Sequence, residues 1–173
     1  DSFVRLHLHP DSGPDGGPLA TFEMKLNGAG EVTAIILPTP EKASWRFTYD
    51  QVFGRTCLKE VQTPVGGRET IDYFDGGHVY PGTPREPLPR VTRHRTYPGS
   101  GQPIEVEYSY TSNNFLGHNA LENWADNGED NLYNVSHDYE YGSVATLKDG
   151  SNILRTVTRT FNRFHLLIEE VTR

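Results

Sequence analysis

Short runs in which apolar and polar side chains alternate recur along most of the chain. A period of two is typical of a half-buried β-strand, because successive side chains point to opposite faces of a sheet. The pattern predicts strands over 3–9, 19–26, 31–37, 45–50, 56–63, 69–74, 90–97, 104–111, 137–146, 153–161 and 165–171. At most one short helix is expected, at Ala120 to Trp124. We therefore expect an all-β fold, an antiparallel sheet built of stacked hairpins.

Glycine-containing turns separate several of these runs. Asn27-Gly28 predicts the turn of a hairpin, since Asn-Gly adopts the left-handed conformation that two-residue hairpin turns need. Phe53-Gly54-Arg55 and Gly66-Gly67 divide residues 45–74 into three strand patterns. The sequence therefore predicts a three-stranded antiparallel meander over that range.

A segment rich in proline interrupts the strand pattern at 78–89, which holds four prolines (HVYPGTPREPLP). Proline lacks a backbone N–H and does not sit inside a sheet, so this segment predicts a long loop or a linker between two lobes. We divide the chain into residues 1–44, with strands and a loop but no repeat, and residues 45–173, where the repeat described below is found.

Composition agrees with many short strands. Aromatic residues make up 11% of the chain, with 17 Gly and 12 Pro. The formal charge of −7 disfavours nucleic acid, whose binding needs concentrated Lys and Arg. Arg90, Arg93, His94 and Arg95 form the one dense basic cluster, which we interpret as the exposed side of a strand. Cys57 stands alone, so it is interpreted as a small core residue. No apolar stretch approaches the ~20 residues that span a bilayer.

One motif resembles a known repeat. Tyr49-Asp50, followed by Gly54-Arg55 and a strand with Leu58 and Val61, is similar to the Tyr-Asp repeat of the Rhs family. Phe161-Asn162 begins a degenerate second copy in which Phe replaces Tyr and Asn replaces Asp. In such a repeat the ring packs inward, the carboxylate bonds turn amides, and glycine supplies an unusual backbone angle. Other stretches resemble the Rhs-type component of bacterial insecticidal toxin complexes; they lie at 63–69, 88–94, 110–117 and 130–133.

The resemblance implies a long β-sheet wound into a hollow shell that encloses a toxic C-terminal polypeptide. The expected function is therefore a non-catalytic wall segment, not an enzyme, secreted or surface-delivered from a bacterium after synthesis in the cytoplasm. Its partners would be neighbouring repeats of the same polypeptide, the enclosed toxin polypeptide and other toxin-complex subunits. We find no counterpart of the family's Asp-Pro-Xaa-Gly self-cleavage region, so the segment would lie upstream of it.

Two other functions remain open. A carbohydrate-binding β-module would use His118, Trp124 and Tyr133, with the indole as a stacking platform. The resemblance leaves room for this function, because proteins of the Rhs family are also often labelled sugar-binding. A small β-fold hydrolase would need an acid–base pair such as His94 with Asp72 or Glu69, but nothing in the sequence brings these residues together. Inward aromatics on successive hairpins favour the shell, and a concave patch of exposed aromatics favours sugar binding.

Two pairs of residues are candidate metal ligands. His7 and His9 are two residues apart on a predicted strand and would point to the same side, as zinc ligands do. Asp126 and Asp130 flank a glycine, as in calcium loops, but the bidentate Glu of an EF-hand is missing. We therefore expect no metal and no cofactor. A last expectation concerns the apolar run His165 to Ile168, which predicts self-association through an exposed edge strand.

Overall fold

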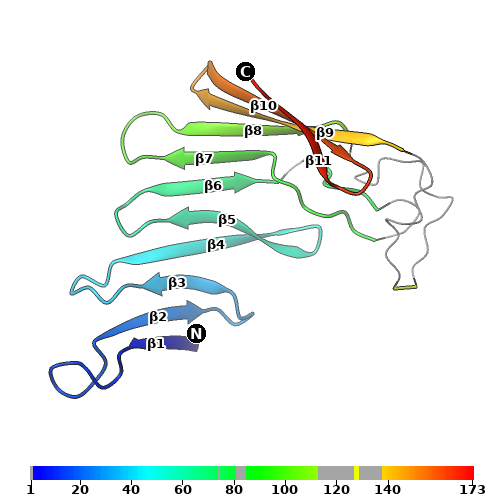
Figure 1. Cartoon of the computed structure of the whole chain (residues 1–173). Coiled ribbons are helices and arrows are strands. Elements are labelled where there is room, and N and C mark those ends of the chain that lie inside the picture. The colour runs from blue at the N-terminus through cyan, green and yellow to red at the C-terminus, as the bar shows by residue number, and fades with distance from the viewer. Residues whose placement is uncertain (1, 74, 81–84, 113–126, 129–137) are drawn as a thin grey trace. The chain divides into compact units, whose positions relative to one another are not determined.

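The computed structural model describes residues 2–73, 75–80, 85–112, 127–128 and 138–173. All regular elements in these ranges are strands, and they form one open antiparallel sheet of eleven strands (Figure 1). The strand order follows the chain order from β1 to β11 without a crossover. The expected all-β antiparallel fold is therefore confirmed. The helix expected at 120–124 lies outside the described residues.

The strand bounds follow the predicted ranges closely. They are β1 (Ser2–Leu8), β2 (Ala20–Leu26), β3 (Val32–Ile36), β4 (Ser44–Val52), β5 (Arg55–Gln62), β6 (Arg68–Asp72), β7 (Arg93–Tyr97), β8 (Ile104–Tyr110), β9 (Glu140–Asp149), β10 (Asn152–Asn162) and β11 (Leu167–Thr172). Strands β4, β5 and β6 are the meander predicted over 45–74.

The chain forms two compact units. The first contains residues 1–50, 58–70 and 97–101, and the second contains 51–57, 71–96 and 102–173. The Pro-rich segment 78–89 lies within the second unit. There His78 and Leu88 exchange two backbone hydrogen bonds of 2.8 Å, which pair the two ends of the segment with each other.

Strands β1 to β4 of the first unit have one apolar face. The register places Val4 opposite Met24, Met24 opposite Ile35, and Ile35 opposite Trp45. Cross-strand partners share a face, so apolar side chains cross all four strands. We call this set the apolar face; it consists of Val4, Leu6, Leu8, Ala20, Phe22, Met24, Ile35 and Trp45.

The opposite face of β1 and β2 carries polar cross-strand pairs. Arg5 Nε donates to Glu23 Oε1 at 2.9 Å, and His7 Nδ1 lies 3.0 Å from Thr21 Oγ1. The Lys25 ammonium lies 5.7 Å from the centroid of the Phe3 ring. One residue of slip would exchange the two faces, so the two kinds of contact together fix the register.

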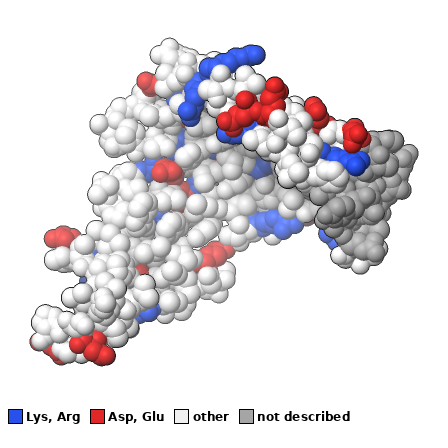
Figure 2. All heavy atoms as spheres, in the orientation of Figure 1, with Lys and Arg blue, Asp and Glu red and all other residues white. Residues whose placement is uncertain are grey.

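In the second unit, ion pairs on one face join Asp72, at the end of β6, to strands β7 to β9. Arg95 of β7 pairs with Asp72 at 3.1 Å and with Glu105 of β8 at 2.7 Å, and Lys148 of β9 pairs with Glu107. Figure 2 shows basic and acidic residues interspersed in the view drawn. Single surface pairs contribute about 0–1 kcal/mol each, so their main consequence is alignment of neighbouring strands.

The turn after β2 differs from the expected two-residue turn. Asn27 N donates to Glu31 O at 2.9 Å and Gly30 N to Asn27 O at 3.0 Å, which closes a five-residue loop. The left-handed residue is Gly30, with φ of 84°, and not Gly28. The Asn27 side chain explains this choice, because its Oδ1 accepts the amides of Ala29 and Glu31, each at 3.0 Å.

The same five-residue loop recurs after β5 at 63–67 and after β10 at 162–166. Its fourth residue is left-handed in both, Gly66 with φ of 87° and His165 with φ of 61°. The side chain of its first residue again accepts turn amides, through Thr63 Oγ1 from Gly67 and through Asn162 Oδ1 from Leu166. A side-chain acceptor at the first position is therefore a recurrent device for closing these hairpins.

Burial is shallow throughout the described residues. Val52, with 5% of its surface exposed, is the one buried apolar side chain among them, and none is fully buried. Thus most of the sheet's side chains remain accessible from at least one side.

Candidate functional site

The second unit contains a buried arginine. Arg90 is 7% exposed, its Nε donates to Asp75 Oδ2 at 2.7 Å, and one terminal nitrogen donates to Ser112 O at 2.8 Å. Its guanidinium also lies 4.3 Å from the centroid of the Tyr110 ring. The expectation that Arg90 lies on the exposed side of a strand is wrong. β7 begins only at Arg93, so Arg90 belongs to the preceding loop and reaches inward.

The loop around this arginine is held by Asp75 and His78. Asp75 Oδ1 accepts the amide of Gly77 at 3.1 Å, and the His78 ring meets Tyr110 edge-on with centroids 5.5 Å apart. Gly77 has φ of 66°, and a Cβ there would lie 2.6 Å from Leu88 O, so only glycine fits. We call Asp75, His78, Arg90 and Tyr110 the Arg90 cluster.

Burial perturbs two titrations in the Arg90 cluster. Burial, with a further contribution from the Arg90 charge, lowers the pKa of His78 below 6.5. Burial raises the pKa of Tyr110 above 10. Both groups are therefore in their neutral forms near neutral pH, and the charge of the cluster resides in the Asp75–Arg90 ion pair.

A groove of about 500 Å³ adjoins the Arg90 cluster. It is lined by Asp72, Asp75, Arg90, Thr92, Arg93, Tyr108, Ser109 and Tyr110. The carboxylates of Asp72 and Asp75 are engaged with Arg95 and Arg90 respectively. With hydroxyls, aromatic rings and paired charges, the groove has the chemistry to hydrogen-bond a polar group.

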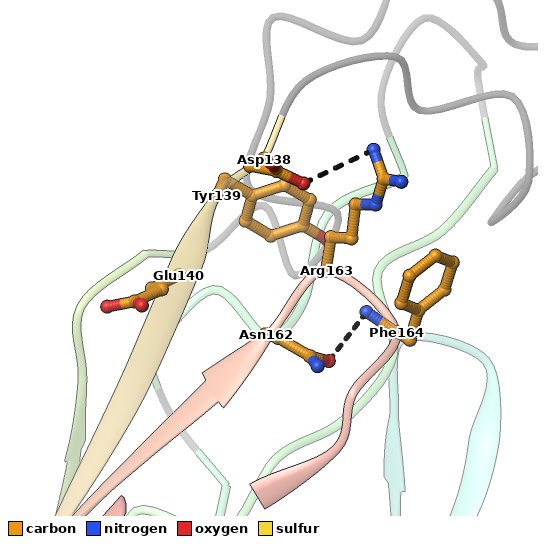
Figure 3. Close-up of a pocket in the computed structure, with 6 residues that line it drawn as sticks. All are labelled: Asp138, Tyr139, Glu140, Asn162, Arg163 and Phe164. Carbon is orange, nitrogen blue, oxygen red and sulfur yellow. Dashed lines mark hydrogen bonds and ion pairs between the residues drawn. The ribbon is translucent and has the colours of Figure 1, made fainter. Parts of the chain in front are cut away.

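A second hollow, of about 580 Å³, lies where β9 begins and β10 ends (Figure 3). Its lining residues are Asp138, Tyr139, Glu140, Asn162, Arg163 and Phe164. Arg163 lies 3.5 Å from Asp138 Oδ1 and 4.7 Å from the centroid of the Phe164 ring. In Figure 3 the Glu140 carboxylate points away from Arg163. The two acidic side chains therefore do not face each other across the hollow.

Aromatic rings pack beside this hollow. Tyr141 stacks on Phe161 with centroids 5.2 Å apart, and its hydroxyl lies 2.5 Å from His165 Nδ1. Burial, followed by the neighbouring Tyr141, raises the pKa of Tyr139 to about 12. These phenols stay protonated at neutral pH, so they serve as packing and hydrogen-bonding groups.

The structure places the repeat residues on two hairpins of different form. Phe53 and Gly54 both have positive φ, of 49° and 68°, and form the two-residue turn after β4, with Arg55 beginning β5. Asp50 Oδ2 accepts from Lys59 Nζ at 3.0 Å across that hairpin. Asn162 instead accepts turn amides within the longer loop after β10.

Tyrosine hydroxyls connect strands to earlier parts of the chain. Tyr49 donates to Val32 O in the first unit and Tyr110 donates to Val91 O in the second, each at 2.7 Å. The residue separations are 17 and 19. Sequence analysis identified Tyr49 as a repeat residue but missed Tyr110 as its counterpart, although Tyr110 also stands near the end of its strand.

The expectation that His7 and His9 share one strand face is wrong. β1 ends at Leu8, and His9 has a left-handed φ of 44°, which ends the alternation. Across the described ranges, no group of three His, Cys, Asp or Glu residues is placed to hold a metal. Asp126 and Asp130 lie outside the described residues.

Two sets of candidates remain, those for sugar binding and those for acid–base chemistry. His118, Trp124 and Tyr133 lie outside the described residues. Asp72 pairs with Arg95, and alternation along β7 turns His94 to the opposite face, so the pair of His94 with Asp72 is not assembled. The part of the chain that the structure describes contains no helix long and apolar enough to cross a membrane.

No protein-family model matches the chain, and no curated protein and no solved structure matches it.

Proposed function

We propose that this chain is a non-catalytic wall segment of an Rhs-like shell that encloses a toxic polypeptide. In this role a continuous sheet separates the enclosed polypeptide from its surroundings. The proposal comes from the resemblance of Tyr49 to Arg55 to the Tyr-Asp repeat, and three features of the sheet support it.

The first feature is the strand order. Each strand pairs with its neighbours in sequence, so the sheet is built by adding hairpins one after another. A wall of any length can be made this way, because every added hairpin offers the same kind of edge to the next.

The tyrosine anchors are the observation that carries the proposal. Tyr49 and Tyr110 each donate a hydrogen bond of 2.7 Å to a backbone carbonyl that lies 17 to 19 residues earlier. Repeats that cannot bury their rings alone need such ties to the preceding segment. The described residues of each unit contain such a tie, which supports a wall of stacked hairpins.

The third feature is the shallow burial of the described strands. Wall material has two accessible faces, whereas a binding module or an enzyme of similar size is normally built around a two-sided core. In the described ranges Val52 is the one buried apolar side chain, which fits a wall with two accessible faces.

The test uses the full natural polypeptide that contains this segment. Limited proteolysis with mass spectrometry should find a C-terminal polypeptide that is protected until the shell is opened. The double variant Tyr49→Phe/Tyr110→Phe should make that polypeptide cleavable at lower protease concentration. Val65→Ala, at a 94% exposed position, is the control and should leave protection unchanged. A C-terminal region as accessible in the native protein as in the denatured one would refute the enclosure role.

A further inference from the structure

The loop that joins β2 to β3 is closed by one asparagine side chain. Asn27 Oδ1 accepts the amides of Ala29 and Glu31, each at 3.0 Å, and Asn27 Nδ2 donates to Glu31 Oε2 at 2.7 Å. The carboxamide is therefore held at both ends, with its nitrogen against a carboxylate. A chemical change of this one group alters three contacts of the loop at once.

The residue after Asn27 determines the chemistry open to that carboxamide. Gly28 is exposed and has no Cβ, so its backbone nitrogen can approach the side-chain carbonyl carbon of Asn27 with little hindrance. The attack forms a bond from Gly28 N to Asn27 Cγ, breaks the Cγ–Nδ2 bond and releases ammonia, which takes up the amide proton. Water then opens the resulting succinimide at either carbonyl and leaves aspartate or isoaspartate at position 27. The reaction needs no reagent other than water.

The loop after β10 has the same geometry without this chemistry. Asn162 Oδ1 accepts the amides of Phe164 and Leu166 at 2.9 and 3.1 Å, two and four residues ahead, as in the loop after β2. However, Arg163 follows Asn162, and the fifth residue of this loop is Leu166 instead of a glutamate. Of the two asparagine-closed loops, only the one after β2 combines a following glycine with a facing carboxylate.

We propose that Asn27 is a site of spontaneous deamidation, and that the negative charge gained there opens the loop between β2 and β3. A carboxylate oxygen takes the place of Nδ2, which lies 2.7 Å from Glu31 Oε2. A hydrogen bond is thereby replaced by two like charges in contact, which disfavours the closed loop. Isoaspartate also adds one carbon to the backbone of the loop. This inference goes beyond the wall role and does not rest on it.

The contacts that deamidation destroys also delay it. Three hydrogen bonds hold the carboxamide of Asn27 in one orientation. In the unfolded chain the same group samples many orientations, including those in which its carbonyl carbon faces Gly28 N. We expect deamidation to be slower in the folded chain than in the unfolded chain by about tenfold or more. Because ammonia is lost, each event is irreversible.

Peptide mapping by mass spectrometry, after incubation of the purified chain at mildly alkaline pH, tests the reaction. Conversion should be found at Asn27 and not at Asn162, and it should be faster in urea than in the folded chain. Gly28→Ala should slow it at least severalfold, because a Cβ there obstructs the attack although it meets no atom in the folded loop. Equal rates at Asn27 and Asn162, or conversion of Asn27 in urea but never in the folded chain, would overturn the assignment.

Charge variants test the consequence for the loop. Asn27→Asp copies the aspartate product, and Glu31→Gln removes the carboxylate that would face it. Asn27→Asp should lower the midpoint of urea denaturation, and the same substitution in the Glu31→Gln background should lower it by less than half as much. The amide protons of Asn27 and Gly30 close the loop, so their exchange with solvent should become about tenfold faster in Asn27→Asp.

Two results would refute the charge mechanism. An equal loss of stability from Asn27→Asp in both backgrounds would show that the Glu31 carboxylate takes no part. An unchanged midpoint with unchanged amide exchange would show that the closed loop tolerates the product.

Discussion

Replacing Gly54 measures how much the β4–β5 hairpin depends on one backbone angle. Gly54 has φ of 68°, and a Cβ added there meets no atom within 4 Å. A substitution therefore introduces no clash, and its cost is purely conformational. For a β-branched side chain in this region the cost is about 1–3 kcal/mol. We expect Gly54→Val to lower the free energy of unfolding by that amount and Gly54→Asn to lower it by less, because Asn tolerates left-handed backbone.

Gly28 supplies the control for this series. It also has open space around its would-be Cβ, but its φ lies outside the left-handed range. Gly28→Ala should therefore be neutral or stabilise by about 0.4–1 kcal/mol, through the lower entropy of the unfolded chain. Urea denaturation followed by circular dichroism gives all three values. Equal stabilities for the Val and Asn variants of Gly54 would refute the conformational explanation.

Three more predictions concern the Arg90 cluster. Tyr110→Phe removes the donor to Val91 O and should cost about 1 kcal/mol in urea denaturation; no change would mean that water replaces the hydroxyl. Asp75→Ala leaves Arg90 buried without its carboxylate and should lower the free energy of unfolding by about 2 kcal/mol or more. The loss should be smaller than for a fully buried pair, because Asp75 is partly solvated. If Arg90→Met is as stable as the wild type, the pair contributes little. The pKa of His78 is lowered in the folded state, so between that pKa and 6.5 the unfolded chain binds more protons than the folded one. The free energy of unfolding should therefore fall as pH drops below 6.5, and His78→Gln should reduce that slope. An unchanged slope would contradict the assignment.

Alternation and glycine placement were enough to predict the strands. They reveal which residues share a face of one strand, as for Phe47 and Tyr49, because the period of two is a property of the extended backbone. They also located the turns at Gly54 and Gly66, where a left-handed residue is needed.

Other features depend on contacts between residues distant in sequence. Asp75 and Arg90 are 15 residues apart across a Pro-rich loop, and no local pattern links them. The sequence alone groups Arg90 with the basic residues at 93–95. Only the start of β7 at Arg93 shows that Arg90 lies outside the strand. In the loop that begins at Asn27, Gly28 and Gly30 could each take the left-handed conformation. The hydrogen bonds of the Asn27 side chain favour Gly30. The apolar face likewise needed the register that pairs Val4 with Met24.

The absence of crossovers in the sheet has a mechanical consequence. Because each strand is paired only with its neighbours in sequence, the sheet can assemble in the order of synthesis, with each hairpin docking as it leaves the ribosome. The same order works in reverse: a pull on either terminus peels away one edge strand at a time. Such a sheet would therefore unfold under a translocating motor in a succession of small steps, one strand at a time, and not in a single cooperative rupture.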